Sequence, residues 1–194
     1  MYNVPNEPIG LPAVEPINMT VALRLTEELC NAKWEKHTGG DHYILPIGNA
    51  LCINAESVTR TVFTKVKIIR DKVTSPTPDV DAVLIPSLVA IERNRPATGL
   101  SSQTTSAVLN WTLNDRMNQP IWVASITGEG TALFPGHPLS KNSARPQVEG
   151  LLKDLFEKSF QEISTARAIQ EFAASVQKRA WRERPLGLSR ADKR

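Results

Sequence analysis

The segment LNWTLNDRMNQPIWVASITGEG, residues 109–130, decides the fold that we predict for this chain. Hydrophobic and polar residues alternate on both sides of its polar centre, which is the pattern of two strands that each bury one face. The centre, NDRMNQP, has the composition of a turn, so the two strands are expected to form a β-hairpin. In this turn Asp115 can accept hydrogen bonds from downstream amides, and Asn118 suits a left-handed backbone position.

The same segment contains two of the four tryptophans of the chain, Trp111 and Trp122. If the hairpin closes about Met117, Trp111 lies near Val123, and the two tryptophans project from opposite faces of the sheet. We therefore predict that Trp111 is in the core. Trp122 is expected either beneath the loops or in an interface, and the two rings are not expected to form a paired aromatic platform.

Hydrophobic periodicity predicts the remaining elements. Strict alternation over residues 17–25 indicates a half-buried strand, and the apolar run at 82–93 indicates a central strand. Pro86 in that run cannot donate a hydrogen bond, so it should lie at a bulge or on a free side. Residues 26–42 form either a short helix or a long loop. Further strands are expected at 42–48 and 65–71, and helices at 49–66, with Asn49 as N-cap, and at 147–176, with a break at 164–168.

Hairpin-like strands flanked by two amphipathic helices predict an α+β fold: a mostly antiparallel sheet with a central hairpin and both helices packed on one face. We divide the chain into an extended, proline-rich arm (residues 1–17), a single α+β domain (18–177) and a basic, disordered tail (178–194).

Composition and charge exclude several classes of protein. The chain has 194 residues, of which 41% are hydrophobic, as in an ordinary globular domain. No run approaches about eighteen consecutive apolar residues, so no transmembrane helix is expected. The net charge is +3, but residues 178–194 carry seven basic and two acidic side chains, so the body is slightly acidic and is not expected to bind nucleic acid. The tail is either a solvated end, which we favour, or a site of peripheral association with anionic membranes.

The chain has two cysteines, Cys30 and Cys52. They are too few for a zinc site, and no CxxC motif is present. Two interpretations stay open: an internal disulfide, which requires an oxidising compartment, or two buried free thiols.

Candidate catalytic and metal-binding motifs are weak. HTGGDH places His37, Asp41 and His42 close together, but the spacing matches no metal motif, and His137 is in another predicted loop. We favour a loop that contains two histidines over a metal site. The sequence has no phosphate-binding loop and no GxSxG elbow, and we identify no catalytic residue, metal site or cofactor.

Three segments, DAVLIPSLVAIERN, LNWTLNDRMNQPIWVASITGEG and LLKDLFEKSFQEI, together resemble families of bacterial envelope lipoproteins. These are the YajG-like and GNA-type lipoproteins and the TolB amino-terminal-like domains. Asp81-Ala82, the turn at Asp115 and Ile121-Trp122 carry the resemblance, which covers residues 15–175. The chain departs from the pattern because Cys30 is too deep to be a lipobox cysteine. The resemblance implies a periplasmic or outer-membrane-associated protein, with its native leader or lipid anchor absent from this sequence.

We therefore expect a non-catalytic envelope protein that acts in assembly, transport or scaffolding. It would bind an envelope protein partner or a second copy of itself through an exposed sheet face or edge, and the candidate interface residues are Leu84, Val89, Ile91 and Trp122. The alternatives are a periplasmic module that binds a small ligand and, third, a metal-dependent enzyme that uses the histidine-bearing loops.

Overall fold

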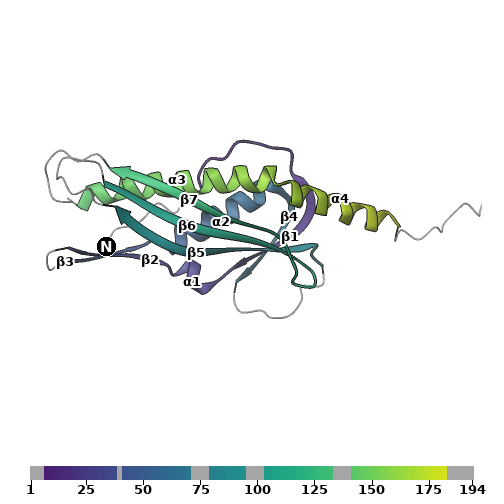
Figure 1. Cartoon of the computed structure of the whole chain (residues 1–194), viewed down its shortest axis with the longest axis horizontal. Helices are drawn as coiled ribbons and strands as arrows, with labels where there is room; N and C mark the ends of the chain where they lie inside the picture. The colour runs from purple at the N-terminus through teal and green to yellow at the C-terminus, as the bar shows by residue number, and fades with distance from the viewer. Residues whose placement is uncertain (1–6, 39–40, 71–78, 95–102, 133–140, 183–194) are drawn as a thin grey trace, which may run out of the picture.

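The structure is a computed structural model that describes residues 7–38, 41–70, 79–94, 103–132 and 141–182 (Figure 1). In chain order the elements are β1 (Ile17–Leu25), α1 (Glu27–Cys30), β2 (Lys33–Thr38), β3 (Asp41–Pro46), α2 (Gly48–Val62), β4 (Phe63–Arg70), β5 (Ala82–Asn94), β6 (Gln103–Asp115), β7 (Pro120–Ala132), α3 (Lys141–Thr165) and α4 (Arg167–Arg182).

The main sheet has five strands in the order β4-β1-β5-β6-β7, and the predicted α+β class is confirmed. The hairpin pairs, β5–β6 and β6–β7, are antiparallel. Strand β1, however, lies between β4 and β5 and is parallel to both, so the sheet is mixed. Strands β2 and β3 form a separate antiparallel hairpin.

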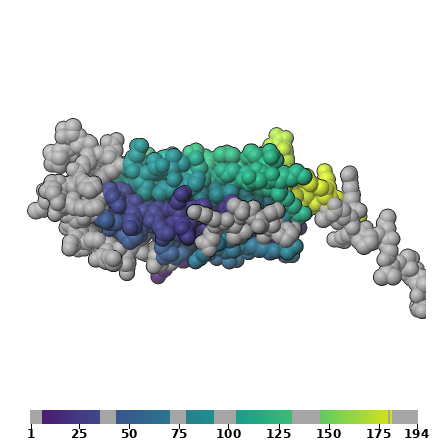
Figure 2. All heavy atoms as spheres, turned by 90° about the horizontal axis from the view of Figure 1, so that it is seen from below, coloured from purple at the N-terminus to yellow at the C-terminus, as the bar shows by residue number. Residues whose placement is uncertain are grey.

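The long helices α2 and α3 lie along one face of this sheet and bury its core (Figure 1). Helix α3 packs on β7, and it approaches so closely that a Cβ on Gly128 or Gly130 would overlap atoms of α3. Helix α4 follows after a break at Ala166 and contacts β1 and β7. The molecule is elongated, and on the side shown in Figure 2 the segment with α1 lies beside β5.

The register of the β6–β7 hairpin corrects our prediction for the tryptophans. Asn114 is opposite Pro120, but the next pair along β6 joins Leu113 to Trp122, because a β-bulge inserts Ile121 between them. The extra residue reverses the side-chain parity of β7, so Trp122 projects from the same face as Leu113 and Trp111. Trp111 is fully buried, and Trp122 is half-buried against the same core.

The predicted boundaries of helix α2 were wrong, and the C-terminal helical segment, predicted at 147–176, begins at Lys141 and ends at Arg182. Helix α2 has Ile47 as its N-cap, with no side-chain cap, and Asn49 belongs to its first turn. The backbone amides of Ile47 and Gly48 donate to the Ala32 carbonyl at 3.1 and 2.9 Å, and these bonds anchor the start of the helix, whose N-cap lies two residues before Asn49. The helix ends at Val62, because Phe63 adopts extended dihedrals and begins β4.

Parts of the predicted arm and of the predicted tail belong to the described fold. In the arm, the Ile9 amide donates a 2.8 Å hydrogen bond to Asn54 Oδ1 on α2, and Leu11 packs against the core. At the other end, residues 178–182 of the predicted tail belong to α4. The rest of the tail, residues 183–194, lies outside the described residues.

Candidate functional site at the hairpin end of the sheet

The turn between β6 and β7 is held by hydrogen bonds within it. Asp115 Oδ1 accepts from the amides of Met117 and Gln119, both at 2.8 Å. Asn118 has a φ of 62°, and its Oδ1 accepts a 3.2 Å hydrogen bond from Asn114 Nδ2. This arrangement presents Met117 to solvent with 82% of its surface exposed.

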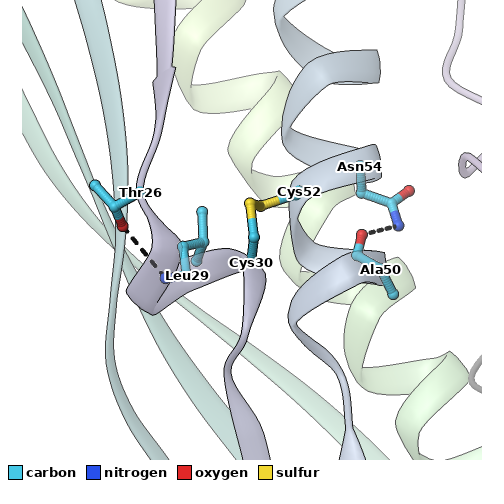
Figure 3. Close-up of a disulfide and its surroundings, with 6 residues drawn as sticks. All are labelled: Thr26, Leu29, Cys30, Ala50, Cys52 and Asn54. Carbon is cyan, nitrogen blue, oxygen red and sulfur yellow. Dashed lines mark hydrogen bonds between the residues drawn. A yellow bond between two sulfur atoms is a disulfide. The ribbon is translucent and has the colours of Figure 1, made fainter. Parts of the chain in front are cut away.

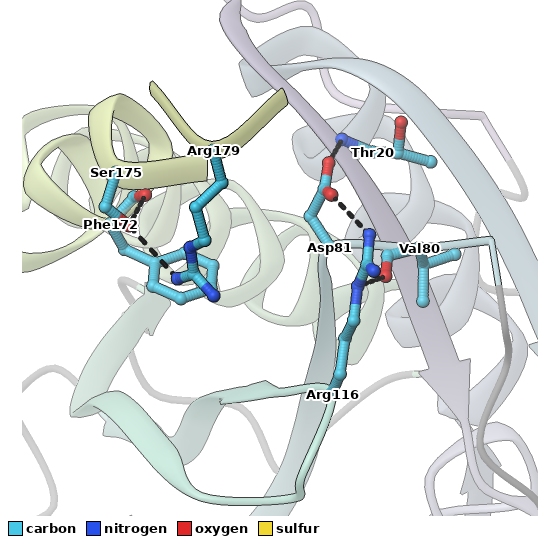
Figure 4. A network of polar contacts seen from close by, with 7 residues as sticks. All are labelled: Thr20, Val80, Asp81, Arg116, Phe172, Ser175 and Arg179. Carbon is cyan, nitrogen blue, oxygen red and sulfur yellow. Dashed lines mark hydrogen bonds and ion pairs between the residues drawn. The ribbon is translucent and has the colours of Figure 1, made fainter. Parts of the chain in front are cut away.

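Arg116 connects this turn to the start of β5. Its Nε donates to the Val80 carbonyl at 2.7 Å, and its Nη2 lies 3.0 Å from Asp81 Oδ1 (Figure 4). Asp81 in turn exchanges hydrogen bonds with Thr20 of β1: its Oδ2 accepts from the Thr20 amide at 2.9 Å, and its own amide donates to the Thr20 carbonyl at 2.8 Å. One aspartate thus joins three parts of the chain that are distant in sequence.

Helix α4 closes this end of the sheet to form a cleft of about 300 Å³. Phe172, Val176 and Arg179 line it from the helix, opposite Asp81 and the turn residues from Asp115 to Met117. Arg179 Nη2 lies 3.5 Å from Ser175 Oγ (Figure 4). Two cations and two carboxylates border an apolar wall, so the charges around the cleft balance.

The cleft residues other than Asp81 and Asp115 were missed by sequence reasoning. Arg116 is separated from Arg179 by the whole of β7, α3 and most of α4. A lone arginine on a turn and another near the end of an amphipathic helix carry no spacing signal. Only the packing of α4 across the end of the sheet brings them together.

Cys30 and Cys52 form a disulfide with a Cα–Cα distance of 5.5 Å (Figure 3). The bond joins the last residue of α1 to the first turns of α2. Thr26 caps α1 by accepting a 3.2 Å hydrogen bond from the Leu29 amide, and Leu29 is buried beside the disulfide. The disulfide therefore fixes a short helix, and the strand that follows it, to the main helical layer.

The four candidate interface residues lie in different environments. Leu84 is fully buried in the core, on the face that the helices cover, so its side chain is not available to a partner. Ile91 and Trp122 are half-buried on the same face. Val89 lies at a β-bulge in β5 with 57% of its surface exposed.

The histidines are only partly placed. His37 and His42 are opposite each other in the β2–β3 hairpin, whereas His137 lies outside the described residues. Among the residues that the structure describes, no three His, Cys, Asp or Glu side chains form a group that could hold a metal ion. In the same part of the chain, no helix has the length and apolar character needed to cross a membrane.

No family model matches the sequence, and no curated protein matches it. A solved structure does share its fold. A protein of Xanthomonas campestris from the DUF330 family superposes with a TM-score of 0.51 at 12% identity, covering 89% of this chain and 95% of that one. A minor lipoprotein of Acinetobacter baumannii has a TM-score of 0.40 at 11% identity, with 85% and 96% covered. Lipoprotein GNA1162 of Neisseria meningitidis has a TM-score of 0.35 at 12% identity, with 78% and 100% covered. The likeness to the Xanthomonas protein is one of fold.

Proposed function

We propose that this chain is a non-catalytic protein of the bacterial cell envelope that acts by binding a protein partner or a second copy of itself. The Cys30–Cys52 disulfide is the observation that carries this proposal. Disulfides persist in the periplasm and outside the cell, and they are rare in the reducing cytosol. This bond uses both cysteines of the chain, so it is a structural bond without a neighbouring thiol to exchange with.

The arrangement of polar and apolar residues supports a binding role in preference to a catalytic one. The polar groups at the hairpin end of the sheet are engaged in holding the turn, β5 and β1 together, as the bonds of Arg116 and Asp81 illustrate. The opposite face of the sheet and its β7 edge carry exposed apolar residues such as Val89 and Val123, which are 57% and 60% exposed. These two side chains are accessible to a protein partner.

The test is the location and thiol state of the protein in its source organism. Cells are treated with a membrane-permeant alkylating reagent before lysis and then fractionated, and the mass of the protein is compared with and without prior reduction. We expect the protein in the envelope fraction, with both cysteines protected until reduction. A cytoplasmic protein with both thiols alkylated would overturn the proposal.

A second candidate function is the binding of a small ligand in the cleft between the turn and α4. Its volume of about 300 Å³ is at the lower limit of ordinary ligand sites. Arg179→Ala and Asp81→Asn variants separate the two functions, because they alter the cleft without touching the β7 edge. This candidate would be favoured if the two variants bind a small ligand more weakly than the wild type does but still bind the envelope partner.

A further inference from the structure

Strand β7 is an edge of the five-stranded sheet, and half of its edge is already occupied by α3. The Glu129 amide donates to Asp154 Oδ2 at 2.8 Å, and the Thr127 carbonyl accepts from Lys158 Nζ at 3.2 Å. Asp154 and Lys158 also form an ion pair with each other at 2.7 Å. The side chains of the helix thus take the place of a neighbouring strand at this part of the edge.

These two bonds reveal which residues of β7 point their backbone groups away from β6. In an antiparallel strand the outward backbone groups belong to alternate residues, and Thr127 and Glu129 are two of them. The pairing of β6 with β7 is regular from Trp122 onwards, so Val123 and Ser125 are the preceding two. Among the described residues, none bonds to the outward backbone groups of Val123 and Ser125.

The features that keep an edge strand from pairing are confined to the start of β7, where Pro120 precedes the bulge at Ile121. Such strands usually carry a lysine, a proline or an inward charge. From Ile121 to Ile126 the sequence is IWVASI, without a charge or a proline, and Val123 is 60% exposed. The strand is therefore shielded over its second half and open over its first.

We propose that two copies of this chain associate by antiparallel pairing of β7 with β7 about a two-fold axis at Ala124. Only this axis sets the two free residues against each other, Val123 of one copy opposite Ser125 of the second, so that all of their outward backbone groups are paired. An axis at Ser125 would set Val123 against Thr127, whose carbonyl Lys158 already holds. An axis at Val123 would set Ser125 against Ile121, the residue of the bulge.

The side chains of the same register are complementary. On the helix-covered face Trp122, which is half-buried, is opposite Ile126 of the second copy, an apolar contact of the type that stabilises antiparallel pairs. The small side chain of Ala124 lies at the axis, where the two copies approach most closely. The ladder extends from Trp122 to Ile126, and it ends where Lys158 of each copy holds the Thr127 carbonyl of its own strand. The result is a continuous ten-stranded sheet.

This inference rests on the proposed function, because it names the second copy as the occupant of the exposed sheet edge. Its test is the molar mass of the full chain by size-exclusion chromatography with light scattering over a dilution series. We expect a dimer that dissociates on dilution. A monomer at every concentration would overturn the inference, and binding of a heterologous strand peptide to that monomer would identify a foreign occupant instead.

Charge exchange on the edge tests the register. In Val123→Lys/Ser125→Lys, lysines are opposite each other across the axis, and we expect a dimer dissociation constant at least about tenfold higher. In Val123→Lys/Ser125→Glu, each lysine is opposite a glutamate, and dimerisation should return to at least the wild-type level. Both positions are exposed, so neither change disturbs the core, and thermal unfolding at a dilution where all variants are monomeric verifies this.

The matched control is Thr131→Lys, an exposed position on the same strand beyond the ladder, which should leave the dissociation constant unchanged. A dimer that survives both lysines, or one that the lysine–glutamate variant does not restore, would place the contact elsewhere and overturn the inference. The envelope location is measured by fractionation and thiol trapping, so it can stand or fall independently of the dimer.

Discussion

Trp111 Nε1 donates a 3.0 Å hydrogen bond to Ser159 Oγ, and this buried bond joins the middle of β6 to α3. Ser159 passes the interaction on, because its hydroxyl donates to the Leu155 carbonyl of the same helix at 2.8 Å. Trp111 and Ser159 are both fully buried. An indole in a core needs such a partner, since its N–H would otherwise lose the hydrogen bond that it makes with water.

Ser159→Ala should therefore lower the free energy of unfolding by about 1–3 kcal/mol, because it leaves the indole N–H buried without an acceptor. Trp111→Phe removes the donor and part of the ring, so it should cost about 2 kcal/mol or more through the cavity. Urea unfolding of both variants and of the double variant measures the coupling between them. Strictly additive losses would contradict a direct interaction.

Loss of the disulfide should destabilise the protein without changing its fold. The bond closes a loop with a sequence separation of 22, for which chain entropy predicts about 3 kcal/mol. Cys30→Ala/Cys52→Ala and reduced wild-type protein should unfold at similarly lower urea concentrations, whereas reducing agent should leave the double variant unchanged. Equal stability of the reduced and oxidised wild type would show that the α1–α2 junction is held by packing alone.

Gly128 and Gly130 are required by the close approach of α3 to β7. A Cβ on Gly130 would overlap the Gln147 carbonyl oxygen and the Leu151 amide, which are backbone atoms that cannot move independently of the helix. Gly130→Ala should cost about 1–3 kcal/mol or displace the helix. The control is Gly150→Ala within α3, where the nearest atom is 3.8 Å away and helix propensity predicts a gain of about 1 kcal/mol. If both changes destabilise equally, the contact is not the cause.

Strand and helix positions were predictable from hydrophobic periodicity, but the pairing of the strands was less so. Alternation identified β1, β6 and β7, and Ser164–Thr165 marked the break between α3 and α4. Alternation also predicts the two faces of each strand, yet it contains no information on where a bulge will occur. The single extra residue at Ile121 moved Trp122 to the face of Trp111.

The parallel position of β1 and the cleft depend on contacts between distant segments. The parallel pairing of β1 with β4 and β5 brings together strands that α2 and residues 71–81 separate in the sequence. The hydrophobic pattern of each strand does not distinguish this parallel arrangement from a series of hairpins. The Asp81–Arg116 pair likewise depends on the approach of β1, the start of β5 and the turn to one another. Such sites follow from topology, which a single sequence without fixed motifs does not specify.

The two partners of this pair should differ in their contributions to stability. Asp81, with a side chain 16% exposed, binds both the Thr20 amide and Arg116, so Asp81→Ala should cost about 1–3 kcal/mol. Arg116 is 62% exposed, and Arg116→Met should cost less than about 1 kcal/mol. Chemical unfolding at low and high salt measures both. A larger loss for the arginine variant would mean that its bond to the Val80 carbonyl is the stronger connection.

The turn provides a test that separates backbone conformation from side-chain bonding. Asn118 has a φ of 62°, a conformation that costs an ordinary L-residue roughly 1–2 kcal/mol and glycine almost nothing. Asn118→Ala should therefore destabilise the protein by about 1 kcal/mol, whereas Asn118→Gly should remain within a few tenths of the wild type. Both variants lose the bond from Asn114 Nδ2, so that bond cannot account for the difference between them. Equal losses would instead assign the effect to the Asn114–Asn118 bond, and Asn114→Ala should then reproduce it in urea unfolding.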